Sequence, residues 1–185
     1  MSEIQANKIS PATGTTFTLG DSGDTFNIPS GATIANAGTA TGFGGDNTPA
    51  FYATSNSANS LTSGAYTKVN FDTEQVDTDS AYDTSSYRFT VPSGEGGKYW
   101  ISASWGADSG NDTDKISVFI RKNGSNIFGM TAVNKAYNST NVSGMAVLAA
   151  TDYIEVFAYQ DSGTTYNINT DGTFTFFMGY KLIGV

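Results

Sequence analysis

The chain has 185 residues, with 17 acidic and nine basic side chains, no histidine and no cysteine, and a net charge of −8. Without cysteine there is no disulfide scaffold, and without histidine the commonest general base and metal ligand are missing. Nucleic-acid binding is excluded because it needs a basic footprint. The longest mostly apolar run, at 145–150, is far shorter than the roughly 20 residues of a membrane span, so no membrane insertion is expected.

The first 48 residues form a compositional block of their own. Apolar residues stand two apart in it, which is the period of a strand. A turn sequence at 20–24, GDSGD, separates two such pairs, which are Phe17 with Leu19 and Phe26 with Ile28. A glycine-rich linker at 35–47 ends the block. We therefore predict a short β-rich segment at 1–48, followed by a separate domain at 49–185.

From residue 49 onward, runs rich in β-branched and aromatic residues recur at short spacing, with turn residues between them. We predict strands at 50–54, 67–71, 86–91, 98–104, 115–122, 126–131, 143–149, 153–159 and 173–183. Asn123-Gly124 favours a type I′ hairpin turn. The last run is long and strongly apolar, so we expect a central strand there. Many short strands of this kind predict an all-β sandwich or barrel.

Four blocks of this second domain carry a family resemblance. They are YDTSSYRFTVP at 82–92 with GKYWIS at 97–102, VFIRKNG at 118–124, SGMAVL at 143–148 with TDYIEV at 151–156, and TFFMGYKL at 175–182. Their order and spacing resemble the globular head of complement component one, subcomponent q (C1q), in the tumour-necrosis-factor-like (TNF-like) jelly-roll superfamily. The resemblance implies a ten-stranded jelly roll that assembles as a trimer and binds through surface loops without catalysis.

The front block resembles a different group of proteins. TFTLGDSGDTFNIPSGATI at 16–34 is similar to segments of fibre and other virion proteins of marine tailed bacteriophages. One copy of so short a segment cannot bury its apolar face, whereas three copies around an axis can pool their apolar side chains. We therefore predict a trimeric anchor or stalk ahead of the jelly roll. Its shared core would consist of Phe17, Leu19, Phe26, Ile28 and Ile34.

Aromatic residues are the main candidates for contact sites, because they dominate both cores and interfaces. We assign one group to the core or to the trimer interface: Tyr99, Trp100, Phe119, Phe157, Phe174 and Phe176. A second group lies in or near predicted loops and is the candidate set for partner contact: Tyr52, Tyr66, Tyr137 and Tyr166.

Two acidic clusters offer weaker candidate sites. Asp108, Asp112 and Asp114 share one loop and could bind Ca²⁺, although a solvated acidic turn is favoured over a metal site. The second cluster, at 72–83, could bind a cation or a sugar, or supply a carboxylate pair for glycoside hydrolysis. A carboxylate pair cannot be placed from the sequence, and we predict no enzyme activity. We predict no cofactor, with Ca²⁺ as the single candidate exception.

These observations together predict a structural virion protein of a tailed bacteriophage, displayed on the particle surface. It would be a homotrimeric capsid decoration protein or a short fibre, joined to other virion proteins by its N-terminal segment. The alternative is a carbohydrate-binding adhesion module, such as the receptor-binding tip of a tail fibre, with a host-surface glycan as partner. A glycan hydrolase is the third and least favoured reading.

Overall fold

The computed structural model describes residues 9–35, 47–108, 115–133 and 139–183. The chain divides into two compact units, Met1–Thr41 and Gly42–Val185, and the second is called the head below. None of the described residues forms a helix long and apolar enough to cross a membrane.

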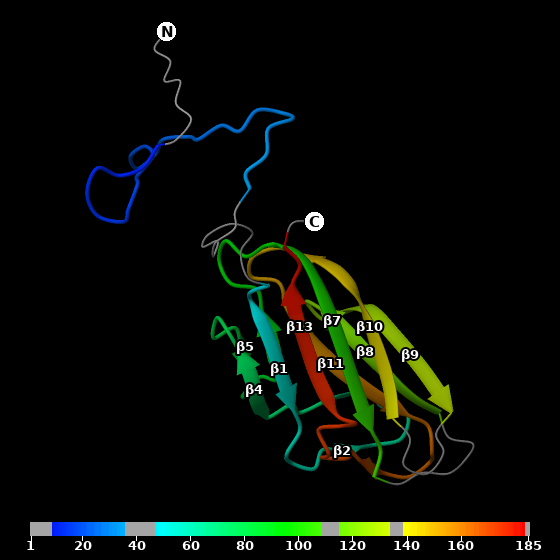
Figure 1. The fold of residues 1–185 in the computed structure, drawn as a ribbon. Coiled ribbons are helices and arrows are strands. Elements are labelled where there is room, and N and C mark those ends of the chain that lie inside the picture. The colour runs from blue at the N-terminus through cyan, green and yellow to red at the C-terminus, as the bar shows by residue number, and fades with distance from the viewer. Residues whose placement is uncertain (1–8, 36–46, 109–114, 134–138, 184–185) are drawn as a thin grey trace. The chain divides into compact units, whose positions relative to one another are not determined.

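One layer of the head is a five-stranded antiparallel sheet (Figure 1). In spatial order its strands are β10 (Ser139–Leu148), β7 (Gly97–Gly106), β13 (Phe176–Lys181), β1 (Ala50–Thr54) and β4 (Thr73–Asp77). The first strand of the head, β1, pairs directly with the last, β13, so that Ala50 lies opposite Tyr180. The chain therefore enters and leaves the head at the same end of the sandwich.

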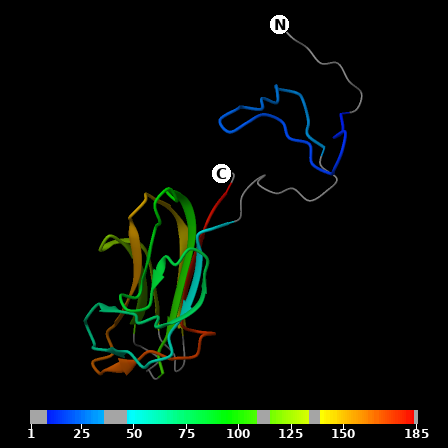
Figure 2. The same cartoon turned by 90° about the vertical axis from the view of Figure 1, so that its left-hand side faces the viewer.

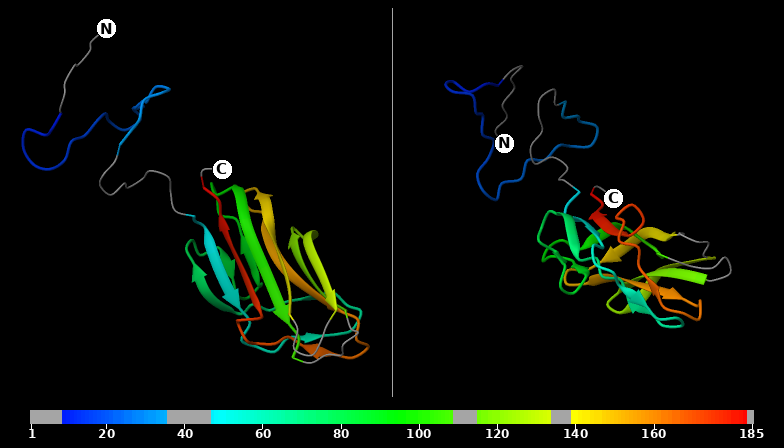
Figure 3. Two further views of the ribbon diagram at one scale, coloured as in Figure 1. Left: turned by 45° about the vertical axis from the view of Figure 1, so that its right-hand side comes forward. Right: turned by 90° about the horizontal axis from the view of Figure 1, so that it is seen from below.

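The second layer is a six-stranded sheet, which Figure 2 and Figure 3 show facing the first. Its main path runs β5 (Tyr82–Asp83), β6 (Arg88–Thr90), β11 (Tyr153–Gln160), β8 (Lys115–Lys122) and β9 (Ser125–Val133). The sixth strand, β3 (Thr67–Lys68), pairs with β11 beside this path. A separate two-stranded ladder joins β2 (Ser60–Leu61) to β12 (Tyr166–Asn167).

Apolar side chains, many of them aromatic, fill the space between the two sheets. Phe177 of β13 is fully buried, and its ring centroid lies 4.8 Å from that of Phe51 and 5.6 Å from that of Phe71. Edge-on and tilted ring pairs of this kind add to the free energy of burial. The buried indole of Trp105 donates a hydrogen bond to the carbonyl oxygen of Ser117 at 2.9 Å, which ties β7 of one sheet to β8 of the other.

The predicted all-β jelly-roll sandwich is confirmed. Strands β1 and β8 have the predicted bounds, and β13 is the central strand of its sheet, as expected. The described residues contain thirteen strands rather than ten. Four of these, β2, β4, β5 and β12, lie outside the predicted runs. Three of the four contain only two residues, and β4 is a largely polar edge strand, so none of them shows a clear apolar alternation.

The predicted hairpin turn between β8 and β9 is also confirmed. Asn123 and Gly124 both have positive φ angles, 50° and 81°, as a type I′ turn requires. The flanking residues Lys122 and Ser125 pair across the turn.

The first unit differs from its prediction, because none of the described residues 9–35 lies in a strand. The turn at 20–24 is present: the amide of Asp24 donates to the carbonyl of Asp21 at 3.0 Å, and the amide of Asp21 donates to Oδ2 of Asp24 at 2.8 Å. The alternating pairs around this turn form no ladder, because two short strands bury too little apolar surface to be stable alone. The described residues of the first unit thus contain no strand in the single chain, and the β-rich trimeric anchor stays a prediction.

Phe177→Ala should destabilise the head by about 3–5 kcal/mol, because it leaves a ring-sized cavity between the sheets. Urea unfolding followed by tryptophan fluorescence measures the change. Phe26→Ala, in the first unit and well exposed, should leave the unfolding of the head unchanged. A loss below about 1 kcal/mol for Phe177→Ala would contradict the central position of this ring.

Candidate functional site: the outer faces of the two sheets

The outer face of the five-stranded sheet carries a band of exposed or half-buried apolar side chains. Successive residues of a strand point to opposite sides, so each strand gives every second side chain to this face. We call the band the apolar face and define it by Tyr52, Val76, Trp100, Met145, Val147, Met178 and Tyr180.

The strand register brings six members of the apolar face together in two rows. One row across three strands consists of Val76, Tyr52 and Met178, and the next consists of Tyr180, Trp100 and Met145. Directly opposed side chains on one face of a sheet lie in contact distance. The most exposed member is Val147 on the edge strand β10, at 71%. Contiguous exposed apolar patches are a feature of protein–protein and membrane interaction sites and of ligand grooves.

The six residues assigned to the core or the trimer interface separate into three places. Tyr99 is buried in the core, and its hydroxyl donates to the carbonyl of Glu95 at 2.6 Å. Trp100 belongs to the apolar face, Phe176 lies on the same side of β13, and Phe174 is exposed just before that strand. The remaining two, Phe119 and Phe157, lie on the outer face of the six-stranded sheet.

The four tyrosines assigned to partner-contact loops lie in different environments. Tyr166 is only 4% exposed and pairs with Leu61 in the small ladder, so its assignment to an exposed loop is wrong. Tyr52 lies within strand β1 rather than in a loop. Tyr66 is 54% exposed in the connection between β2 and β3, which keeps it a candidate. Tyr137 lies outside the described residues.

The first acidic cluster is only partly described. Oδ1 of Asp108 accepts a hydrogen bond from the amide of Asn167 at 3.2 Å, while Asp112 and Asp114 lie outside the described residues. In the ranges that the structure covers, no group of three or more acidic residues could hold a metal ion. Calcium binding by this loop stays a prediction.

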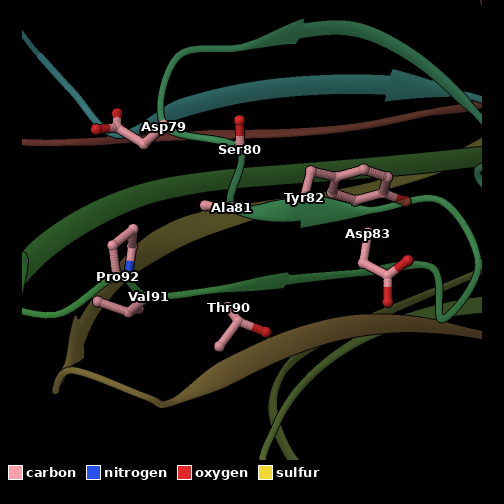
Figure 4. Close-up of a pocket in the computed structure, with 8 residues that line it drawn as sticks. All are labelled: Asp79, Ser80, Ala81, Tyr82, Asp83, Thr90, Val91 and Pro92. Atoms are coloured by element: carbon pink, nitrogen blue, oxygen red, sulfur yellow. The ribbon is translucent and has the colours of Figure 1, made fainter.

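The second acidic cluster borders a shallow pocket of about 320 Å³ beside β5 and β6. Figure 4 shows Asp79 and Asp83 at opposite ends of its lining. The side chains of Ser85 and Ser86 donate to the carboxylate of Asp83, and these hydrogen bonds hold its pKa well below the ordinary value. Asp83 therefore stays ionised at neutral pH and has no proton to give as the general acid of a glycosidase.

Another acidic residue of this cluster has a structural role. Oδ1 of Asp77 accepts from the amide of Ala81 at 3.0 Å, and Oδ2 accepts from the amide of Tyr82 at 2.8 Å. These bonds close the loop between β4 and β5 and satisfy backbone groups that would otherwise lack partners.

The outer face of the six-stranded sheet carries a second notable group, which the sequence analysis did not assemble. Tyr66, Phe119, Arg121, Phe157 and Tyr159 lie side by side there, and we call them the arginine–aromatic cluster. They come from three separate parts of the chain, so only the pairing of β8, β11 and β3 brings them together. The alternation of β8 and β11 was the one signal in the sequence that could have placed them on a common face.

Asp152 connects the β10–β11 turn to the β8–β9 hairpin. Its carboxylate accepts hydrogen bonds from the side chain of Lys122, the amide of Ala149 and the side chain of Asn123, each at 2.7 Å. The bond from Lys122 contributes most to lowering the pKa of Asp152 from 3.8 to about 2.

Comparison with known proteins supports the fold alone. No family model matches the sequence, and none of the curated proteins matches it either. The globular domain of the zebrafish complement 1qA protein matches with a TM-score of 0.51 and 13% identity, over 72% of this chain and 97% of that one. Murine APRIL at pH 5.0 matches with a TM-score of 0.57 and 16% identity, over 72% and 98%.

The TNF protein Eiger from S. frugiperda also matches, with a TM-score of 0.55 and 13% identity, over 72% of this chain and 91% of that one. The head is thus an all-β domain with the C1q/TNF-like jelly-roll fold, as the four sequence blocks predicted. These identities are too low to carry function from those proteins to this chain.

Asp152→Asn should lower the free energy of unfolding at pH 7 by about 1 kcal/mol, because it removes a charge-assisted hydrogen bond. The pKa of Asp152 is lower in the folded chain, so the ionised group stabilises the fold fully above pH 4, and this contribution is lost as the pH falls toward 2. Thermal unfolding between pH 7 and pH 2 should show the variant approaching the parent chain below pH 4. A difference that stays constant to pH 2 would contradict this role.

Proposed function

We propose that the chain is a homotrimeric structural protein on the surface of a tailed-bacteriophage particle, as a capsid decoration protein or a short fibre. The observation that carries the proposal is the apolar face, which spans all five strands of one sheet. The resemblance of the front block to phage virion proteins supports the particle location.

Self-association follows from the chemistry of the apolar face. Its valine, methionine, tryptophan and tyrosine side chains are the types enriched at interface centres, and they stay exposed in the single chain. A second copy offers the same side chains, and closed rotational symmetry lets a patch of this kind be covered without leaving an open end. The resemblance to the C1q and TNF-like heads favours three copies.

The first unit supplies the proposed attachment. Its apolar side chains are exposed in the single chain, with no ladder to order them: Ile9, Phe17, Leu19, Phe26, Ile28 and Ile34. Three copies in one assembly would bring these side chains to a high effective concentration. They could then form a shared core and present a trimeric surface to another virion protein.

Met178→Lys should convert the trimer into single chains, because it places three charges in the middle of a buried apolar interface. Met178 lies on the central strand β13 and is 39% exposed in the single chain. Sedimentation velocity measures the result.

Met130→Lys is the matched control. Met130 is 51% exposed, but it lies on β9 of the other sheet, outside the apolar face. This variant should keep the mass of the parent protein. If both variants sediment with the mass of the parent protein, or both as single chains, the interface does not lie specifically on the apolar face.

Phe26→Asp should produce particles that lack the protein, while the purified variant keeps the mass and unfolding curve of its head. The expected cause is loss of the apolar core that the first unit forms on assembly. Quantitative mass spectrometry of gradient-purified particles from a phage carrying the variant measures incorporation, with Asp21→Asn as a polar control in the same unit. Absence of the parent protein from purified particles would overturn the virion role.

A further inference from the structure

The arginine–aromatic cluster is an ordered platform on the outer face of the six-stranded sheet. The exposed ring of Tyr66 lies 5.3 Å from the centroid of Phe119 and 5.1 Å from that of Tyr159. The guanidinium carbon of Arg121 lies 3.7 Å from the ring centroid of Phe157 and 5.5 Å from that of Tyr66. The cation thus lies against two rings, which is a favourable electrostatic arrangement.

Two neighbours hold this platform in place. Gly129 lies opposite Phe119 on β9, and a Cβ atom at that position would meet the Phe119 ring at 2.7 Å. Glycine therefore leaves room for the ring to lie over the strand. Oδ1 of Asn126 accepts a hydrogen bond from Nε of Arg121 at 2.8 Å, which fixes the guanidinium plane. A side chain ordered before binding loses less entropy when a ligand arrives.

The six-stranded sheet is rich in basic residues, although the whole chain is negatively charged. The chain carries −8, yet its strands β3, β6 and β8 hold five basic residues: Lys68, Arg88, Lys115, Arg121 and Lys122. Two of the lysines form ion pairs, with Glu155 and Asp152. Within the described part of the chain, neither arginine forms an ion pair. A guanidinium without an ion pair, beside the exposed ring of Tyr66, fits a ligand with an anionic group and a flat apolar face.

We propose that the arginine–aromatic cluster binds an acidic glycan. The apolar face of a pyranose ring stacks on Tyr66, and the carboxylate of the same or the next sugar accepts hydrogen bonds from the guanidinium of Arg121. The stacking supplies contact area that tolerates different sugars, and the arginine selects those that carry a carboxylate.

The position of the cluster makes it compatible with the proposed trimer and independent of it. It lies on the opposite side of the sandwich from the apolar face, so association through that face leaves it open. Each copy carries all five of its residues. Glycan binding can therefore be present whether or not the protein is a trimer or part of a particle.

The test is a glycan array that presents uronic-acid and sialic-acid oligosaccharides beside neutral ones, probed with the full-length protein. Binding to acidic glycans is expected. Isothermal titration then uses the strongest acidic glycan and its carboxyl-reduced form. Reduction should weaken binding about tenfold, since it removes the partner of Arg121. Binding to neutral glycans alone, or to none on the array, would overturn the proposal.

Variants locate the site on the protein. Tyr66→Ala and Arg121→Gln should each weaken binding about tenfold, whereas Tyr66→Phe keeps the ring and should bind as the parent does. Lys115→Gln removes an equal charge from the start of the same strand and should have no effect. Thermal unfolding confirms that each variant is folded. Unchanged affinity in folded Tyr66→Ala would overturn the assignment, and a tenfold loss in Lys115→Gln would show general charge attraction instead.

Discussion

A two-layer sandwich has four sheet faces, and in this head the buried core lies between the two that face each other. In this head the inner faces are closed by aromatic packing around Phe177 and by the hydrogen bond from Trp105 to Ser117 across the layers. The outer faces carry exposed or half-buried side chains, and they differ in chemistry. One carries exposed or half-buried apolar side chains on each of its five strands, whereas the other combines rings with basic side chains.

Because the two outer faces differ in chemistry, they suit different partners. An apolar face is best covered by a surface of its own kind, which a second copy supplies, while ordered rings and unpaired guanidinium groups suit a polar, anionic ligand. The first unit also exposes apolar side chains in the single chain. Its apolar side chains have no inner face to fill within one chain, so their burial depends on what assembles around them.

The sequence predicted most of the head because apolar alternation reports directly on sheet faces. It identified the bounds of β1 and β8 and the turn at Asn123-Gly124. It missed β4 because Val76 is the one apolar residue among its five, so there is no alternation to detect. It misplaced Tyr166 because turn-rich surroundings suggested an exposed loop, while the pairing with Leu61 is a contact between residues far apart in the chain.

The candidate site was harder to predict from the sequence than the fold was. Trp100 and Phe176 were assigned to a core or an interface, but only the strand order shows that they share one outer face with Met145 and Val147. The arginine–aromatic cluster depends on a contact between Tyr66, in the connection before β3, and Phe119 of β8, which lie in distant parts of the sequence. Periodicity cannot reveal pairings of that kind.

The central claim is that the apolar face joins copies of the chain. Light scattering of the purified protein, with and without residues 1–48, tests it most directly. The expected mass is that of three chains of 19.4 kDa for the full-length protein, and that of three shortened chains for the truncated protein. A mass of one chain for both forms would contradict it, because the apolar face would then be exposed to solvent in the native protein.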